Sequence, residues 1–370
     1  MEHYLDNAAT TKVCDEAIEA ATFAMKENYG NPSSTHTKGR EAKKLLDECR
    51  KTVADTLGCN ESEIVFTSSG SESDNWAIIN SARANKKNGK HIISSIVEHD
   101  AVKKSLDVLE KEGFEITRLS PNETGVITLD SVLSAIKDDT ILISLMMVNN
   151  ETGAVTDIKE IATKVKEDHP NILIHTDAVQ GFKKIPFKAK TLNIDMISIS
   201  GHKIHATKGI GALYIKDKIK LPPFIVGGEQ ENGKRASTEA LPQIAAFAAA
   251  CKEDSKIDYI KSLKEDLIDK LKDNIPEIKY IVNDAPHILN ISMPGWKSEV
   301  LMNFLEEKEV YVSKSSACKQ GKRSQVLEAL NLDSRYIDGS LRIGLSRYNT
   351  TEDINALVEG LKEARNLMHN

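Results

Sequence analysis

Hydrophobic and polar positions alternate between a helical period and short apolar runs along the first two thirds of the chain. Helical periodicity, with abundant Ala, Lys, Glu and Leu, covers these stretches: 13–28, 37–58, 71–88, 100–112 and 157–168. The apolar runs have the length of buried strands: EIVFTSS (63–69), HIISSI (91–96), EITRL (115–119), TILISLMMV (140–148), ILIHTD (172–177), MISIS (196–200) and GALYI (211–215). Strands separated by helices in this way predict βαβ crossovers and a mostly parallel sheet that helices cover on both faces.

The pattern changes in the last third of the chain. An Ala- and Lys-rich stretch predicts one long helix from about 240 to 273. Shorter patterns follow: strands at ILNISM (288–293), VYVS (310–313) and LRIGLS (341–346), and helices at 297–308 and from about 351. These elements predict a second, smaller α+β unit. We therefore expect a large domain over residues 14–255 and a small domain made of residues 1–13 and 256–370.

The composition is that of a globular protein. The 370 residues are 40% hydrophobic, and 49 basic against 55 acidic residues give a formal net charge of −6. A nucleic-acid binder would usually be basic, so we expect no direct binding of nucleic acid. The chain lacks an apolar run of about 18 residues, and its beginning, MEHYLDNAATTKV, lacks the pattern of a signal peptide. We expect a cytoplasmic protein with no membrane segment.

Polar side chains follow the ends of five predicted strands. They fall in these segments: 68–71, 99, 149–151, 177–180 and 200–203. In sheets of parallel strands, ligands bind beyond the carboxyl ends of the strands. The sequence therefore predicts one ligand site to which all five segments contribute.

Lys203 is the most informative residue of these segments, because it follows a strand among small polar residues, in SGHKIHATKG. A lysine in such a place suits a Schiff base with an aldehyde cofactor, although a solvated loop lysine fits as well. Asp177 ends a strand about 25 residues earlier and could pair with a protonated pyridine nitrogen, or could cap a helix. Gly70 and Ser71 open a predicted helix, whose first N–H groups could bind an anion.

Five cysteines are spread along the chain: Cys14, Cys49, Cys59, Cys251 and Cys318. An odd number without close CxxC pairs fits neither a disulfide framework nor a zinc site, so we expect reduced thiols. Cys318 differs from the others, because it lies in the polar segment KSSACKQGKRSQ (314–325) with basic residues nearby. Such surroundings favour a thiolate, whereas a structural cysteine normally lies in an apolar pattern.

A series of motifs in one order resembles the cysteine desulfurases of the NifS/IscS type, within the class V aminotransferases. The motifs are YLDNAATT (4–11), NPSSTH (31–36), FTSSGSESDN (66–75), EHDAV (98–102), VNNETG (148–153), HTDAVQ (175–180), SGHKIHATKGIGALY (200–214), GGEQE (227–231), SSAC (315–318) and LRIGLSRYNTTED (341–353). The resemblance implies the type I fold of pyridoxal-phosphate enzymes, an α/β fold. Its large domain has a mostly parallel seven-stranded sheet, and the smaller domain is α+β. It also implies a homodimer with active sites near the subunit boundary.

The resemblance assigns roles around pyridoxal 5′-phosphate. Lys203 would form the Schiff base and Asp177 would pair with the pyridine nitrogen. Gln180 would reach the phenolic oxygen of the ring, and His99 would lie over the ring face and move protons. The phosphate would be held by Gly70, Ser71, Ser200 and His202, and from the other subunit by Thr238.

The substrate residues are implied in the same way. Arg342 would grip the carboxylate of the substrate, Asn150 would help to orient it, and Asn31 would assist at the carboxylate. The implied reaction converts L-cysteine into alanine and leaves the sulfur as a persulfide on Cys318. The persulfide would then pass to a protein acceptor, either an iron–sulfur scaffold or a ThiI-like sulfurtransferase that serves tRNA thiolation.

Three departures from the family pattern concern local structure and partners. Ser69 stands where the family often has Gly, and RASTEA has Ser237 and Ala240 where RSGTEN is more usual. These last two could change the backbone at the subunit contact. The segment after Cys318, KQGKRSQ, is about two residues shorter and more basic than is usual. This difference favours a ThiI-like acceptor over an iron–sulfur scaffold.

Other functions on the same fold remain open. Selenocysteine lyase, cystathionine-type β-elimination and transamination need no thiol at position 318, so Cys318 favours the desulfurase. A non-catalytic relative would not need Lys203, Asp177 and Cys318 together. A metal site built on His202 and His205 is disfavoured, because the HxxH pattern lacks a suitably placed Glu and a helical context.

Overall fold

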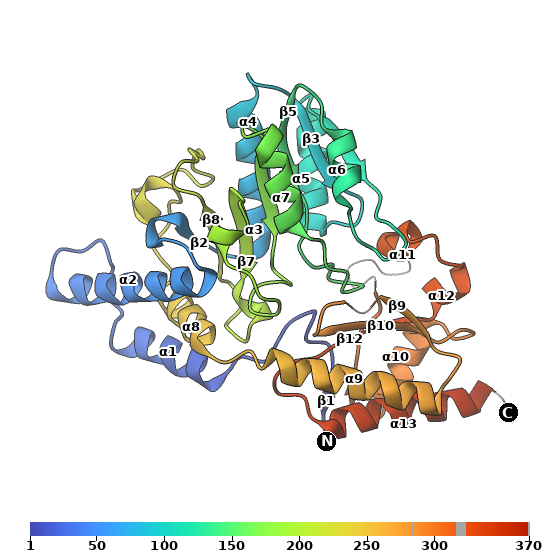
Figure 1. Cartoon of the computed structure of the whole chain (residues 1–370). Coiled ribbons are helices and arrows are strands. Elements are labelled where there is room, and N and C mark those ends of the chain that lie inside the picture. Colours follow the sequence, from blue (N-terminus) through green and yellow to red (C-terminus); the bar gives the residue numbers. More distant parts are fainter. Residues whose placement is uncertain (283, 316–322, 369–370) are drawn as a thin grey trace.

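The computed structural model describes residues 1–282, 284–315 and 323–368, and its centre is a seven-stranded sheet (Figure 1). In spatial order the strands are β2 (Ile64–Thr67), β8 (Gly211–Ile215), β7 (Met196–Ser200), β6 (Leu173–Asp177), β5 (Thr140–Ser144), β3 (His91–Ser95) and β4 (Glu115–Leu119). Strand β8 runs antiparallel to both of its neighbours, and the remaining pairs are parallel. The prediction of a mostly parallel sheet is thus confirmed.

Both faces of this sheet are covered. Successive strand residues point to opposite sides, so neighbours in one strand pack into different clusters. On β3, Ile92 belongs to one hydrophobic cluster and Ile93 to another. The helices of this region are α1 (Asp15–Lys26), α2 (Thr37–Leu57), α3 (Gly70–Asn75), α4 (Ser81–Asn85), α5 (Asp100–Lys111), α6 (Leu129–Ala135), α7 (Ile158–Asp168) and α8 (Leu241–Lys252). A π-helical stretch, Trp76–Asn80, joins α3 to α4 without a break. Helices on both faces of the sheet explain why its strands are rich in apolar residues.

A second sheet lies to one side of the first, below it in Figure 1. Its antiparallel strands are β9 (Lys279–Val282), β10 (Ile288–Ser292) and β12 (Ser340–Gly344). Its helices are α9 (Ile257–Asn274), α10 (Ser298–Glu306), α11 (Gln325–Ala329), α12 (Ser334–Asp338) and α13 (Thr351–Met368). A short parallel pair joins β1 (His3–Tyr4) to β11 (Val310–Tyr311), so the N-terminal segment packs beside a strand from the last third of the chain. The domain boundary at residues 255 and 256 stays a prediction.

One predicted element is wrong: residues 240–273 do not form a single helix. Helix α8 ends at Lys252 and α9 begins at Ile257, with Lys256 in a left-handed conformation (φ 48°) between them. The Nζ of Lys183 donates to the carbonyl oxygen of Cys251 at 2.6 Å, and also to that of Glu253. A contact from a distant residue therefore caps α8, and helical periodicity carries no trace of it.

The length and composition of the helices decide whether any of them could cross a membrane. Within the described ranges, no helix has both the length and the apolar character that crossing a bilayer requires.

Candidate active site

A cavity of about 290 Å³ opens at the carboxyl ends of the parallel strands. Among the residues that line it are ten that the sequence singled out: Gly70, Ser71, His99, Asn150, Asp177, Gln180, Ser200, His202, Lys203 and Arg342. They come from loops after five strands of the large sheet and from β12 of the small one. The N-terminal segment closes the cavity with Ala8 and Ala9.

Three further predicted residues are not among those that line the cavity in the described part of the chain. Asn31 and Thr238 are exposed and do not line this cavity. Cys318 lies outside the described residues. Ser237, beside Thr238, has a φ of 138°, a conformation that L side chains rarely adopt. The serine has therefore kept a backbone conformation that suits the glycine usual at this position.

Lys203 lies in a short turn directly after β7, and its Nζ points at the N-terminal segment. It donates to the carbonyl oxygens of Ala8 at 2.8 Å and Ala9 at 2.6 Å. Backbone carbonyls leave no signal in a sequence pattern, so this contact could not be derived from side chains. The lysine is thus held at the wall of the cavity by neutral groups that a bond to a cofactor can replace.

Two buried carboxyl groups form the floor of the cavity. Burial raises the pKa of Asp177, against the opposing charges of His99 and Lys203. The pKa of Asp74 is raised further, first by burial and then by the charge of Asp177. Val179 N donates to Asp177 at 2.9 Å, and Asp74 Oδ1 has no hydrogen-bond partner among the described residues. A cationic N–H in the cavity would therefore be strongly stabilised here.

Asp74 was missed by the sequence reasoning, although it lines the cavity. It lies in the helical stretch SESDN, and an acidic residue in a helix is ordinarily exposed. Its neighbour His175 is fully buried, with its ring nitrogens near Ser144 and Ser198 at 2.9 Å each. Burial lowers the pKa of His175 to about 3, so this histidine is neutral and supplies no counter-charge.

The two histidines of the cavity are fixed by different partners. His99 is the N-cap of α5, and its Nδ1 accepts a hydrogen bond from Ala101 N at 3.1 Å. A neutral ring then carries its proton on Nε2. His202 Nδ1 lies 3.2 Å from Thr10 Oγ1, and burial, with Lys203 next, lowers its pKa to about 4. Both rings are therefore held in fixed orientations at the cavity.

The start of the α3 helix has the features of an anion cradle. Ser69 caps it by accepting from Glu72 N at 3.1 Å. A Cβ on Gly70 would lie 2.6 Å from a methyl carbon of Val179, so only glycine fits there. The first N–H groups of a helix lack intrahelical partners and attract phosphate. Together with Lys203 and the two acids, this end of the cavity matches the aldehyde, pyridine and phosphate groups of pyridoxal phosphate.

Arg342 brings a buried guanidinium from the second sheet to the same cavity. It donates to Asp6 Oδ1 at 2.9 Å, to Ser313 Oγ at 2.7 Å and to the carbonyl oxygen of Asn150 at 3.0 Å. Its Nε is buried and has no partner among the described residues. The side chain is thus held in place and keeps a donor for a bound carboxylate.

The four cysteines that the structure describes are buried and reduced: Cys14, Cys49, Cys59 and Cys251. Burial raises the pKa of each thiol, to about 11 for Cys49 and to about 12 for Cys59 and Cys251. These thiols stay protonated near neutral pH, so they are poor nucleophiles.

Comparison with known proteins gives a consistent result. The model of the aminotransferase class-V family matches residues 3–357. The cysteine desulfurase IscS of Methanosarcina thermophila is 42% identical, with 97% of this chain and 91% of that protein aligned. The putative cysteine desulfurase IscS 1 of Bacillus subtilis is 40% identical, with 95% of each chain aligned.

Solved structures agree with these relatives. A NifS-like protein superposes with a TM-score of 0.93 and 33% identity, over 99% of this chain and 100% of that one. A structure described as SspA in complex with cysteine has a TM-score of 0.83 and 33% identity, over 95% of this chain and 100% of that one. The chain therefore belongs to the aminotransferase class-V family, among the pyridoxal-phosphate-dependent cysteine desulfurases of the NifS/IscS type.

Proposed function

We propose that this chain removes the sulfur of L-cysteine, releases alanine and holds the sulfur as a persulfide on Cys318. The observation that carries the proposal is the meeting of Lys203, Asp177 and Arg342 around one cavity. These residues supply an amine, a buried acid and a carboxylate-binding group. The cysteine bound to SspA, a relative of the same fold, supports the choice of substrate.

Pyridoxal phosphate supplies an electron sink that makes the Cα–H bond of an amino acid weak enough to break. Asp177 would hold a proton at the pyridine nitrogen, and the start of α3 with Ser200 and His202 would bind the phosphate. Lys203 removes the Cα proton once it is released from its resting position. His99 presents Nε2–H over the site, where it can deliver or accept protons.

Arg342 and Asn150, which line the cavity, orient the substrate. Asp6 and Ser313 hold the guanidinium of Arg342, so its orientation is set before the substrate arrives. A guanidinium fixed in this way binds a carboxylate with little loss of side-chain freedom.

Cys318 performs the sulfur transfer. Its thiolate attacks the sulfur of the substrate and forms an S–S bond, while the Cβ–S bond breaks. The electron pair of that bond goes to the substrate carbon, which takes a proton and leaves as alanine. The sulfur stays behind as the outer atom of the persulfide.

The two ends of the segment that carries Cys318 support this role. Asn290 Nδ2 donates to Ser315 Oγ at 2.7 Å, and Ser324 Oγ donates to the carboxylate of Glu151. Glu151 follows Asn150, which lines the cavity. At about 3.6 Å per residue, the three residues from Ser315 to Cys318 can span at most about 11 Å.

The test is the release of alanine and sulfide from L-cysteine, in the presence of a reductant. Cys318→Ala should abolish both products and leave the visible absorbance of the bound cofactor. Cys59→Ala, which removes a buried thiol, is the control and should retain activity. Full activity of Cys318→Ala would refute the persulfide step, and activity confined to L-selenocysteine would favour a selenocysteine lyase.

We also propose a homodimer in which Thr238, which is exposed in the single chain, contacts the phosphate of the partner subunit. The cytoplasm is the expected compartment, and the short basic segment 319–325 favours a ThiI-like acceptor for tRNA thiolation. Transfer of labelled sulfur to a U-type iron–sulfur scaffold in preference to a ThiI-like protein would contradict this choice of acceptor.

A further inference from the structure

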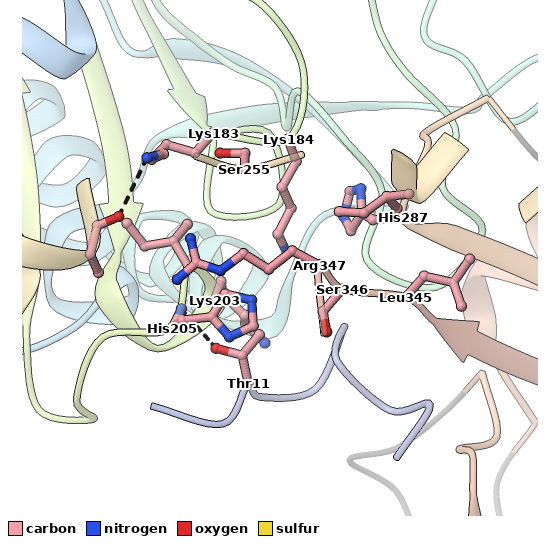
Figure 2. Close-up of a pocket in the computed structure, with 13 residues that line it drawn as sticks. Thr11, Lys183, Lys184, Lys203, His205, Ser255, His287, Leu345, Ser346 and Arg347 are labelled. Carbon is pink, nitrogen blue, oxygen red and sulfur yellow. Dashed lines mark hydrogen bonds between the residues drawn. The ribbon is translucent and has the colours of Figure 1, made fainter. Parts of the chain in front are cut away.

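A second, smaller cavity shares Lys203 with the cavity described above. It measures about 30 Å³, and its lining includes Lys183, Lys184 and His287. Figure 2 shows that the two adjacent lysines diverge. The side chain of Lys183 turns toward a carbonyl oxygen at the end of α8, and the side chain of Lys184 runs down into the cavity. The reaction described above uses neither Lys184 nor His287.

Lys184 contacts the cofactor site through Gln180. Its Nζ donates to Gln180 Oε1 at 3.2 Å. Burial lowers the pKa of Lys184 well below its usual value, and the charges of Lys203 and Arg342 act in the same direction. The amine has N–H groups to donate whether or not it carries the extra proton, and the amide oxygen of Gln180 can accept one of them.

His287 makes a second contact with the same oxygen atom. Its Nε2 lies 3.2 Å from Gln180 Oε1, and its Nδ1 is buried without a partner among the described residues. Burial lowers the pKa of His287 well below its usual value, so the ring is neutral and has one N–H. A carbonyl oxygen has no hydrogen to donate, so that N–H must be at Nε2.

These two contacts agree with a third, to a carbonyl oxygen that can only accept, about which way the amide of Gln180 faces. With Oε1 held on the side of Lys184 and His287, Nε2 points to the opposite side and donates to the carbonyl oxygen of Ala8 at 2.8 Å. An amide nitrogen has two hydrogens, so one remains for a group bound in the main cavity, which Gln180 also lines. The reversed amide would set Nε2 against two donors and Oε1 against the Ala8 oxygen.

We propose that Lys184 and His287 are positioning residues that lock the amide of Gln180 with its nitrogen toward the cofactor. The proposal rests on the proposed function in one respect, the contact between Gln180 and the phenolic oxygen of pyridoxal phosphate. An N–H at that oxygen withdraws negative charge from it. The oxygen then attracts less strongly the proton on the neighbouring nitrogen. That nitrogen is the atom that would link Lys203 to the cofactor. The lock therefore lowers the pH at which this proton leaves.

The experiment is a pH titration of the visible absorbance of the holoenzyme. Lys184→Met should raise the midpoint by roughly 0.5–1 pH unit, the equivalent of one hydrogen bond. Gln180→Ala should raise it by a similar amount. Adding Lys184→Met to Gln180→Ala should change the midpoint little, because coupled residues are not additive. Lys184→Arg, which restores the donor, should return the midpoint toward that of the wild type.

Lys183→Met is the matched control. It removes a lysine next in the sequence and on the same cavity, but the Nζ of Lys183 bonds to backbone oxygens at the end of α8. It should lower the melting temperature and leave the midpoint unchanged. Should Lys184→Met fail to fold, His287→Leu removes the other donor and should give a smaller shift in the same direction.

Three results would overturn the proposal: an unchanged midpoint in Lys184→Met, an equal shift in Lys183→Met, or the same shift in the wild-type and Gln180→Ala backgrounds. The last would mean that the charge of Lys184 acts directly. The titration needs bound cofactor but no turnover. A protein that shows the shifts and makes no alanine would therefore refute the proposed function and leave this inference standing.

Discussion

Two buried charged groups of this molecule are built in opposite ways. The first is the Arg50–Glu231 pair, which lies between α2 and the loop before α8. Its guanidinium makes two bonds of 2.7 Å to the carboxylate and one of 2.9 Å to the carbonyl oxygen of Ile64. Phe66 N also donates to Glu231 at 2.9 Å. Each charge meets a charge of the opposite sign, and both have further partners.

The second group is the floor of the cofactor cavity, where charges are buried without such partners. Asp74 and Asp177 lie close together, with one backbone N–H on Asp177 and no partner on Asp74 Oδ1 among the described residues. Lys184, in the adjoining smaller cavity, faces the amide of Gln180 instead of an acidic group. Perturbed, poorly paired groups in a cavity indicate a functional site, whereas paired ones indicate structure. The comparison teaches that burial alone does not mark the site; missing partners do.

Asp177→Asn should show the largest difference between the functional group and the structural pair. It removes the charge that holds the pyridine proton, and we expect a fall in kcat of about 10²–10³-fold. The free energy of unfolding should stay the same or rise, because a buried and poorly paired charge is lost. Alanine release and urea unfolding measure the two effects, and a large loss of stability without a loss of kcat would reverse the assignment.

Glu231→Gln should show the opposite behaviour. It leaves the Arg50 guanidinium buried without its counter-charge, and we expect a loss of about 3–5 kcal/mol in the free energy of unfolding. The kcat of the remaining folded protein should be unchanged. Glu112→Gln, which breaks the more exposed pair with Arg83, is the control and should cost less than about 1 kcal/mol.

Glu98→Gln should give an effect that depends on pH. Glu98 is a third buried carboxyl group near Asp177, and burial raises its pKa from 4.5 to about 8. Its contribution to stability is complete below pH 4.5 and is lost as the pH rises to about 8. The stability of the wild type relative to Glu98→Gln should therefore fall by about 1.4 kcal/mol per pH unit across that range. Urea unfolding at several pH values tests this, and a constant difference would contradict it.

Much of the fold and of the site could be predicted from the sequence because the signals were local. The strands of the large sheet are short apolar runs, and nine of the predicted residues at their ends line one cavity, together with Arg342 from β12. The break between α8 and α9 could not be predicted, because a lysine from another part of the chain causes it. Helix α6 and strand β9 were also missed, since they are short and lack clear periodicity.

The missing parts of the site share a physical reason. Asp74 looks like any exposed acid of a helix, and its meaning comes from burial next to Asp177. Ala8 and Ala9 act through backbone oxygens, and Lys184 acts through an amide. The roles given to Asn31, Thr238 and Cys318 stay predictions. Residue types predict chemistry where a side chain acts directly, and they are silent where it acts through a neighbour.

The pairing of β1 with β11 has a consequence for the order of events on the ribosome. Residues 3 and 4 emerge long before their partners at 310 and 311. The large sheet, which ends at Ile215, can form while the chain is still growing. Ala8 and Ala9, which hold Lys203, can settle only when the final strands arrive. The protein therefore becomes able to enclose its cofactor only after β11 has been synthesised, and a chain truncated before β11 should be unable to retain pyridoxal phosphate.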